Sequence, residues 1–381
     1  MTVLSCKYRI YPNKQQILKM TDMLESFCDL YNAALQQRID AYRRKSVSLG
    51  FYEQSAELKA VRAVDERLIQ YSFTAEQQVL RRLDKAFKAF FGRVKKGHAG
   101  FPRFQSKSRF GSAEFRVGDG LTIRKTGHIG IVGIPGQIKV KWHRSIPANA
   151  KVSAAVVSRA CGKWYACFQV TAPEVYGPWP DKGAVGIDVG LSSLIATSDG
   201  ETIDAPKFAK KSFRKHRRLQ RAVSRRKLGG KRRLKAKQNL SRHSAKTANQ
   251  RRDFAHKLSR NLVGRYSLIA VEDLNVSGLA KSMLSKPICD AAWTQLRAMI
   301  EYKAENAGVR VVAVNPRGTS QTCPECGAVA VKALATRIHD CPECGCVLDR
   351  DVAAARVILH RAFPELRPGH GLEALSVRVT A

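Results

Sequence analysis

The chain has 381 residues, of which 44% are hydrophobic, and its formal net charge is +36. This hydrophobic fraction is typical of a globular protein and excludes a disordered chain, and the length allows two or three domains with their own cores. The excess of positive charge predicts a polyanionic partner. An anionic membrane is the alternative, but the sequence has no apolar run near the ~18 residues that a spanning helix needs.

The ten cysteines are compatible either with a secreted, disulfide-bonded protein or with a metal site. Four of them form two Cys-x-x-Cys pairs, Cys323/Cys326 and Cys341/Cys344, and the others are scattered. In a large basic chain this arrangement favours metal over disulfides. Because the N-terminus also lacks a basic-then-apolar signal peptide, we expect a reducing, cytoplasmic location.

The N-terminal third is predicted to be mainly helical after a first strand over residues 3–10. A helix is expected after Pro12-Asn13, because apolar residues then recur at helical spacing: Met20, Leu24, Phe27, Tyr31 and Leu35. A second helix is expected to begin at Thr74, with Gln77 completing a capping box. Its apolar stripe comprises Leu80, Leu83, Phe87, Phe90 and Val94.

The opposite face of this second helix is basic and nearly free of acids, and it includes Arg81, Arg82 and Lys88. A basic face is often only solvated, but here contact with nucleic acid is the favoured interpretation. Aromatic and basic residues alternate just beyond, at Phe101, Arg103, Phe104, Phe110, Phe115 and Arg116. They are suited to stacking on bases, although core packing is the more frequent use of such aromatics.

From about Ser112 to Thr171 the pattern changes to short β segments separated by turns. We expect a small barrel that residues 3–10 complete, with the helical block 13–96 inserted into it. A boundary is expected at Pro178-Trp179-Pro180. Beyond it, strands are predicted over residues 184–191, 194–197, 202–203, 266–271 and 309–314, and helices around Trp293 to Gly308 and from Asp351 to about Ala362.

Between these later strands, residues 207–260 hold 22 lysines or arginines and one acid, Asp253. Gly229-Gly230 divides the interval, which predicts two helices folded back on each other to grip phosphates rather than a disordered tail. Arg217, Arg218, Arg225, Arg232 and Arg233 are candidate contacts. The expected apolar anchors of these helices are Phe208, Phe213, Leu219, Val223, Phe254 and Leu258.

Three acids lie at the ends of predicted elements: Asp188 ends one strand, Glu272 ends another and Asp351 opens the last helix. Any one of them has a simpler explanation as a helix cap or solvent-facing acid. Together, beside the basic interval, they predict a carboxylate cluster that needs cations, because close like charges repel. Hard oxygen ligands suit Mg²⁺ or Mn²⁺, and two such ions ~4 Å apart would hydrolyse a phosphodiester.

The two Cys-x-x-Cys pairs predict a tetrahedral, structural Zn²⁺ site formed by Cys323, Cys326, Cys341 and Cys344. Prolines and glycines flank both pairs in the same arrangement, which is typical of tight knuckle turns. Cys346 is an alternative ligand to Cys344.

These motifs resemble those of TnpB, the RNA-guided RuvC-like nucleases of IS200/IS605- and IS607-type insertion sequences, which are related to type V CRISPR effectors. The resemblance is carried by residues 186–190 (GIDVG), 271–274 (VEDL), 319–327 (TSQTCPECG) and 349–351 (DRD). Further matching stretches are residues 86–91, 100–104 and 252–258. The resemblance covers nearly the whole chain.

The resemblance implies an α+β multidomain fold. Its parts would be a wedge-type β-barrel (1–11 and 105–180), a helical recognition lobe (12–104), an RNase H-like RuvC nuclease domain (181–320 and 349–365), a zinc-binding target-nucleic-acid-binding insert (321–348) and a flexible tail (366–381). It also implies a bacterial or archaeal, nucleoid-associated protein.

The activity implied is RNA-guided cleavage of double-stranded DNA next to a short transposon-adjacent motif, with a guide RNA made from the transposon end. Asp188, Glu272 and Asp351 would be the catalytic, Mg²⁺-binding residues. The family usually has Asn two residues after the last acid, where this chain has Ala353. That departure keeps a cleavage-deficient RNA-guided repressor as an alternative, and a DNA-joining transposase is a third hypothesis.

Overall fold

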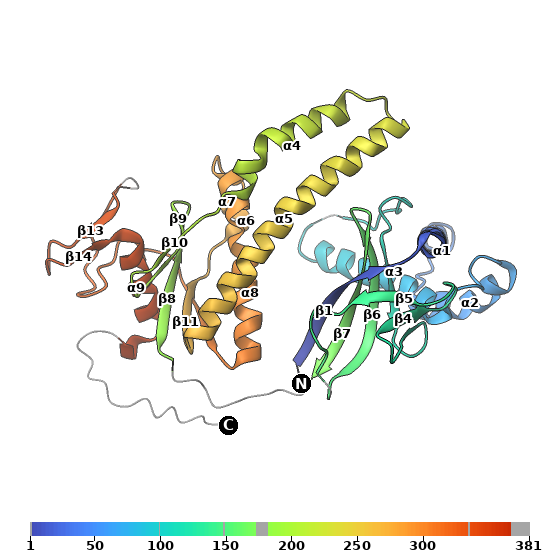
Figure 1. Ribbon diagram of the computed structural model, residues 1–381, viewed down its shortest axis with the longest axis horizontal. Coiled ribbons are helices and arrows are strands. Elements are labelled where there is room, and N and C mark those ends of the chain that lie inside the picture. The colour runs from blue at the N-terminus through green and yellow to red at the C-terminus, as the bar shows by residue number, and fades with distance from the viewer. Residues whose placement is uncertain (1, 99, 148, 173–181, 334–335, 367–381) are drawn as a thin grey trace. The chain divides into compact units, whose positions relative to one another are not determined.

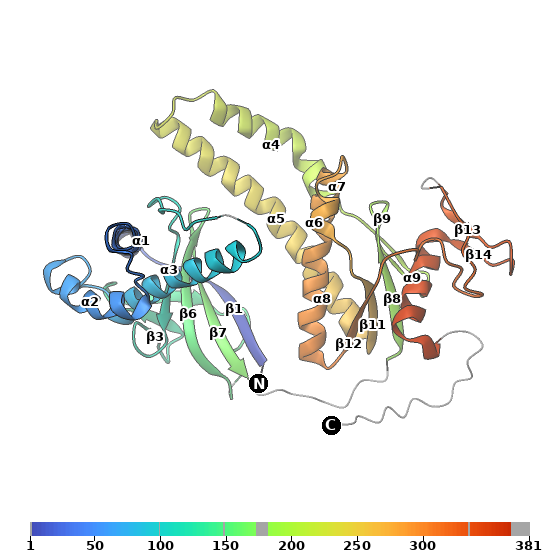
Figure 2. The ribbon, with the colours of Figure 1, turned by 180° about the vertical axis from the view of Figure 1, so that it is seen from behind.

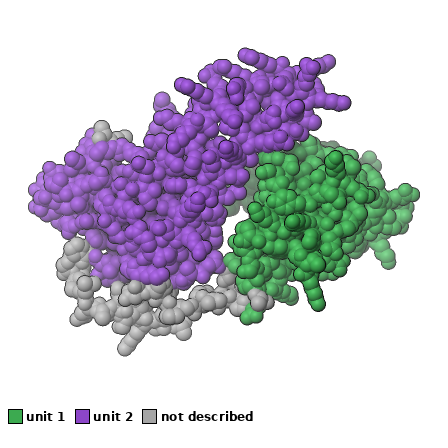
Figure 3. All heavy atoms as spheres, viewed as in Figure 1, with its two compact units in different colours: residues 1–174 green, residues 175–381 purple. Residues whose placement is uncertain are grey.

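The computed structural model describes residues 2–98, 100–147, 149–172, 182–333 and 336–366. They form two compact units, residues 1–174 and 175–381 (Figure 3). The predicted boundary at Pro178-Trp179-Pro180 and the predicted tail beyond residue 366 lie outside the described residues. Among the helices that are described, none combines the length and apolarity needed to cross a membrane.

The first unit is built on one antiparallel sheet of seven strands in the order β2-β6-β7-β1-β5-β4-β3. The strands are β1 (Thr2–Tyr11), β2 (Ser112–Arg116), β3 (Leu121–Ile123), β4 (His128–Ile131), β5 (Ile138–Lys141), β6 (Lys151–Ala160) and β7 (Lys163–Ala172). An isolated bridge between Val117 and Leu121 links the ends of the two edge strands, so the sheet is nearly a barrel. As predicted, the first strand completes it, because β1 pairs with both β7 and β5.

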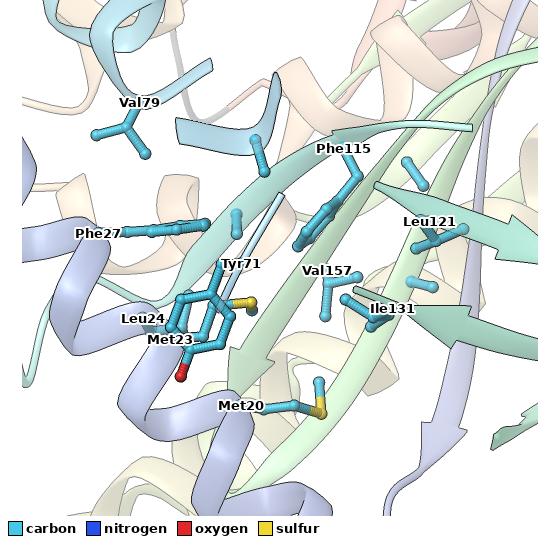
Figure 4. Packing of buried hydrophobic residues seen from close by; sticks show 14 of the residues in the cluster. Met20, Met23, Leu24, Phe27, Tyr71, Val79, Phe115, Leu121, Ile131 and Val157 are labelled. Atoms are coloured by element: carbon cyan, nitrogen blue, oxygen red, sulfur yellow. The ribbon is translucent and has the colours of Figure 1, made fainter. Parts of the chain in front are cut away.

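Three helices lie between β1 and β2 in the chain: α1 (Lys14–Lys45), α2 (Phe51–Val64) and α3 (Phe73–Val94). The predicted start of the first helix is correct, since Asn13 and Gln16 form a reciprocal capping box with bonds of 2.8 and 2.9 Å. The predicted stripe of α1 is buried. Figure 4 shows Met20, Leu24 and Phe27 packed with Tyr71 against side chains of the sheet.

The predicted capping box at Thr74 and Gln77 is wrong. The N-cap of α3 is Ser72, whose hydroxyl accepts from the amide of Ala75, and the Gln77 side chain instead donates to Ser55 Oγ at 2.9 Å. Ser72 and Thr74 are both good N-cap residues, so the choice between them depends on packing. The predicted stripe is fully buried only at Leu80 and Leu83 and ends at the half-exposed Val94.

The aromatic residues after α3 divide between two environments. Phe110 and Phe115 are buried in the core, whereas Phe101 and Phe104 are about half exposed. Phe101 packs its edge on Phe87 and Phe90, with ring centroids 5.6 and 5.3 Å away. Base stacking is therefore excluded for Phe110 and Phe115.

The second unit is built on a five-stranded sheet in the order β10-β9-β8-β11-β12. Its strands are β8 (Ala184–Val189), β9 (Ser193–Thr197), β10 (Thr202–Asp204), β11 (Leu268–Glu272) and β12 (Arg310–Val314). β8, β11 and β12 run parallel, while β9 and β10 are antiparallel to their neighbours. These strands match the predicted segments to within a few residues.

Helices cover both faces of this sheet (Figures 1 and 2). On one face, α5 (Lys231–Arg265) and α8 (Trp293–Ala307) pack on the side chains of Val185, Ile187, Ile269 and Val271. On the other face, Ile358 of α9 (Arg350–Ala362) packs on Ala270. Two short helices, α6 (Val276–Leu279) and α7 (Ser285–Ala291), precede α8.

The basic interval forms the predicted pair of helices, α4 (Phe208–Ser224) and α5, side by side in both ribbon views (Figures 1 and 2). Phe208 and Phe254 are in ring contact at 6.3 Å, as expected of anchors. Every residue of α4, all of which the structure describes, is at least partly exposed, and Phe213 is 51% exposed. Phe213 is therefore not the buried anchor that was predicted.

The cysteine segment between β12 and α9 carries a two-stranded hairpin, β13 (Ile338–Asp340) and β14 (Val347–Asp349). The described chain ends in a 3₁₀ turn, η1 (Pro364–Leu366).

Candidate active site and cysteine cluster

Two of the predicted acids lie side by side at the carboxyl ends of adjacent parallel strands. The register pairs Val271 with Ile187, so the next residue of each strand places Glu272 beside Asp188. Neighbouring strands are ~4.8 Å apart. Because Ile187 and Val271 are buried under α5 and α8, the alternation of the strands directs Asp188 and Glu272 to the opposite face, where α9 packs.

The third acid, Asp351, reaches this face in the first turn of α9. The neighbouring Asp349 is the N-cap: its Oδ1 accepts from the amides of Asp351 and Val352 at 2.9 and 3.1 Å. Because Asp349 caps the helix, the Asp351 carboxylate remains available to bind a cation. This supports Asp351 rather than Asp349 as the predicted metal ligand. Gly190 lies just beyond the end of β8. A β-carbon added to Gly190 would be 3.9 Å from Asp351 Oδ2.

Close packing of α9 on β8 depends on Gly186. A β-carbon at this position would lie 1.9 Å from the carbonyl oxygen of Ala355 and 2.8 Å from the backbone nitrogen of Leu359. Because both atoms belong to the helix backbone, a side chain at residue 186 would have to push α9 away from the sheet. Gly186 therefore controls how near Asp351 comes to Asp188.

The three carboxylates influence one another electrostatically. Burial, followed by the charges of Glu272 and Asp351, raises the pKa of Asp188 to about 7. Burial also raises the pKa of Glu272, and the hydrogen bond from Thr319 and the charge of Arg361 oppose that rise. A cluster of this kind is stabilised by a cation, which removes the repulsion among the carboxylates.

Thr319 is a residue of the candidate site for which the sequence analysis predicted no role of its own. Its hydroxyl donates to Glu272 Oε1 at 2.6 Å and so fixes one oxygen of that carboxylate. Thr319 belongs to the segment that leads from β12 into the cysteines, 47 residues from Glu272, and is itself buried.

The described residues contain two sets of three or more candidate ligands within 4.8 Å of one another, one of four cysteines and one of two cysteines and a histidine, and neither includes a carboxylate. The oxygens of Asp188, Glu272 and Asp351 are therefore spread more widely than the ligands of a closed single-ion site.

The first of those sets is the predicted one, Cys323, Cys326, Cys341 and Cys344. The Sγ atoms of Cys323 and Cys344, and those of Cys326 and Cys341, are 3.6 Å apart. Four sulfurs at 2.3 Å from a tetrahedral Zn²⁺ would be ~3.8 Å apart, so the set fits this ion. Cys346 belongs to the second set, with Cys323 and His339, rather than standing in for Cys344.

The turns that shape the two cysteine pairs are equivalent. The amide of Gly327 donates to the carbonyl of Cys323, and the amide of Gly345 donates to that of Cys341. Both glycines have positive φ, 80° and 69°, which a side chain would strain. Repetition of this turn explains why the four thiols converge.

Some of the predicted nucleic-acid contacts have partners within the protein, and others are exposed side chains. In α3, Arg81 stacks over Phe51, Arg82 donates to the carbonyl of Ser112 and Lys88 pairs with Asp84. Arg233 donates to the carbonyl oxygens of Val223, in the last turn of α4, and of Arg226, just after α4, so its guanidinium has a structural role. The remaining candidates, Arg103, Arg217, Arg218, Arg225 and Arg232, are exposed.

The chain matches known protein families, relatives and solved structures. Three family models match it: one described as a probable transposase over residues 168–283, one described as a Cas12f1-like TNB domain over residues 293–358, and one described as a helix-turn-helix domain over residues 1–46. In this structure residues 1–46 form β1 and the single long helix α1 instead of two helices.

A putative RNA-guided DNA endonuclease of Streptomyces pristinaespiralis is 33% identical over 372 residues, which span 96% of this chain and 91% of the relative. The putative RNA-guided DNA endonuclease InsQ of Escherichia coli K12 is 32% identical over 67% of this chain and 65% of its own length. A solved Cas12f1–sgRNA–target DNA complex aligns with a TM-score of 0.58 and 15% identity, over 91% of this chain and 83% of that one.

The structural match defines the class: a mixed α+β protein with the fold of a compact Cas12f-type effector. The sequence matches then show the family, and the chain belongs to the TnpB family.

Proposed function

We propose that this chain is an RNA-guided DNA endonuclease of a transposable element that cuts double-stranded DNA beside a short transposon-adjacent motif. The observation that carries the proposal is the convergence of Asp188, Glu272 and Asp351 on one face of a partly parallel sheet. Membership of the TnpB family supports a guide RNA, which would be made from the transposon end, and a duplex DNA target. The charge of +36 is of the sign that both partners require.

In this proposal, residues 181–320 and 349–365 form a RuvC-like nuclease domain of the RNase H type and residues 321–348 form its zinc-binding insert. The barrel (1–11 and 105–180) and the helical lobe (12–104) would be the wedge and recognition parts. The strand order and the placement of α9 across β8 support the first assignment.

Asp188, Glu272 and Asp351 would hold Mg²⁺ or Mn²⁺, since carboxylate oxygens are the ligands these ions prefer. When bound, the ions would supply an activated water and stabilisation of the leaving oxygen of the phosphodiester. Thr319 would keep one Glu272 oxygen oriented, and the backbone amides that occupy Asp349 would leave Asp351 as the helix-start ligand. The four thiolates would hold Zn²⁺ as a structural ion.

One observation favours a second function, an RNA-guided repressor without cleavage. Ala353 stands where the family usually has an asparagine, two residues after the last acid, and it is buried. An alanine there supplies no polar group to the metal site.

A single experiment separates the possibilities. Protein purified with its RNA, which is sequenced to define the guide, is incubated with Mg²⁺ and duplexes that carry the matching target beside a randomised flank. The proposed endonuclease cuts duplexes with a specific subset of flanks. Tight binding with every duplex intact would establish the repressor instead, and strand-joined products formed without RNA would establish a transposase.

A further inference from the structure

His339, at the centre of β13, is a buried group that neither proposed metal site uses. His339 is fully buried, and its Nε2 has no hydrogen-bond partner within the described part of the chain. One ring nitrogen lies within 4.8 Å of the sulfurs of both Cys323 and Cys346. A buried imidazole with this environment is suited to be a metal ligand.

The fold of the hairpin explains the grouping. β13 runs directly into Cys341, Cys346 directly precedes β14, and the amide of Cys341 donates to the carbonyl of Cys346 at 3.0 Å. His339 in β13 and Cys346, one residue before β14, are therefore brought near each other and near the buried Cys323. Of the four zinc ligands, Cys323 and Cys341 are buried whereas Cys326 and Cys344 are exposed.

Lys332 lies beside the imidazole of His339 and the sulfur cluster. Its Nζ contacts Nδ1 of His339 and lies within electrostatic range of the thiols of Cys323, Cys341 and Cys346. Nε2, the other ring nitrogen, has no hydrogen-bond partner among the described residues and is free to bind a metal. The cluster therefore brings together a buried imidazole, a lysine amine and three thiols.

We propose that His339 and Cys346 form, with Cys323, an inner ligand set that retains Zn²⁺ when the exposed thiolates Cys326 and Cys344 are lost. A ring nitrogen of His339 would then bind the metal, and Cys323 is common to both sets. This inference rests on the proposed zinc site, and it assigns a second, partly nitrogen-ligated state to the same ion.

The test uses Co²⁺ as the probe, because sulfur-to-cobalt absorption reports the number of thiolate ligands. The full-length chain is expected to bind one Co²⁺ with four thiolates. The Cys326→Ser/Cys344→Ser variant is expected to bind one Co²⁺ with a mixed sulfur and nitrogen spectrum. Adding His339→Gln should weaken that binding by about tenfold or more, whereas adding His98→Gln, at an exposed histidine of the first unit, should not.

Failure of the two proposals is distinguishable. If the unsubstituted chain binds no Co²⁺, the zinc site itself is wrong. If it binds Co²⁺ but a folded Cys326→Ser/Cys344→Ser variant does not, or if His339→Gln leaves the affinity of that variant unchanged, the inner set is overturned.

A second measurement applies even if the double variant does not fold. In the otherwise unsubstituted chain, which keeps all four thiolates, His339→Gln should speed the loss of Zn²⁺ to a chelator roughly tenfold relative to His98→Gln, because partly released metal has no inner ligand. Equal rates of loss would contradict the proposal.

Discussion

Thr319 is the residue whose contribution to the carboxylate site is most easily isolated. Its hydroxyl is 2.6 Å from Glu272 Oε1 and 3.1 Å from the carbonyl oxygen of Pro316, so Thr319→Val removes the hydrogen bond to the carboxylate and the weaker local one while it keeps the shape of the side chain. We expect the Mg²⁺ concentration for half-maximal cleavage to rise about tenfold, because groups that orient metal ligands typically contribute that much to affinity.

Thr322→Val is the matched control, since that hydroxyl donates to the carbonyl of Gly318 at 2.9 Å, away from the carboxylates. An unchanged Mg²⁺ requirement in Thr319→Val would show that Glu272 is positioned by other contacts.

Glu76 gives a prediction about pH in the first unit. The side chain is fully buried and pairs with Arg62 at 2.9 Å, yet burial outweighs that partner and raises the pKa of Glu76 to about 7. Since this pKa exceeds the unfolded value of ~4.3, the neutral acid is favoured in the folded state, and its contribution to stability is lost as pH rises from ~4 through ~7.

Glu76→Gln cannot ionise, so its unfolding free energy relative to the unsubstituted chain should rise between pH 4 and pH 8 by on the order of 3 kcal/mol. Urea unfolding at several pH values measures the difference, and the exposed Glu66→Gln should show little pH dependence. A constant difference for Glu76→Gln would mean that the ion pair with Arg62 keeps Glu76 charged.

The contact between α9 and β8 is the element pair on which the site depends. In Gly186→Ala, the new methyl would meet helix backbone at 1.9 Å, so α9 must move and carry Asp351 with it. We expect a loss of about 3 kcal/mol in unfolding free energy and a large loss of cleavage. At Gly264 of α5 an added methyl meets nothing within 4 Å, so Gly264→Ala should be neutral or slightly stabilising. Equal stability of the two variants, measured in denaturant, would refute the packing argument.

Elements with a buried apolar run or face were predictable from the sequence, and the stripe of α1 and the strands β8 and β11 are examples. The three-residue strands β13 and β14 and the four-residue α6 were not predicted, because they are too short for a repeat, although the equally short β10 was. The exposure of Phe213 was also beyond prediction, because α4 packs mainly on α5 and has little else to bury it.

At the scale of the whole molecule, charge is the dominant property, and 22 of the basic residues lie in residues 207–260. The exposed Arg217, Arg218, Arg225 and Arg232 are the proposed phosphate contacts. Replacing all four with Gln should reduce the slope of log affinity against log salt by about 3, if each releases one counterion. Binding titrations at several salt concentrations measure this slope. An unchanged slope would place the phosphate contacts elsewhere.

The acids of the candidate site could be predicted because each lies near the end or the start of an element, and such positions can be recognised in the sequence alone. Gly186 and Thr319 could not be given their roles in this way. The importance of Gly186 comes from the backbone of a helix about 170 residues later, and Thr319 acts on a carboxylate 47 residues earlier. Contacts of this kind depend on tertiary packing, which periodicity does not encode.

The central claim, that Asp188 belongs to a metal-dependent nuclease site, is tested most directly by cleavage of a guide-matched duplex in Mg²⁺. The account predicts that Asp188→Asn binds RNA and duplex as the unsubstituted chain does but leaves the DNA intact, while Asp204→Asn, at an exposed acid that ends β10 of the same sheet, cuts normally. Undiminished cleavage by Asp188→Asn would contradict it.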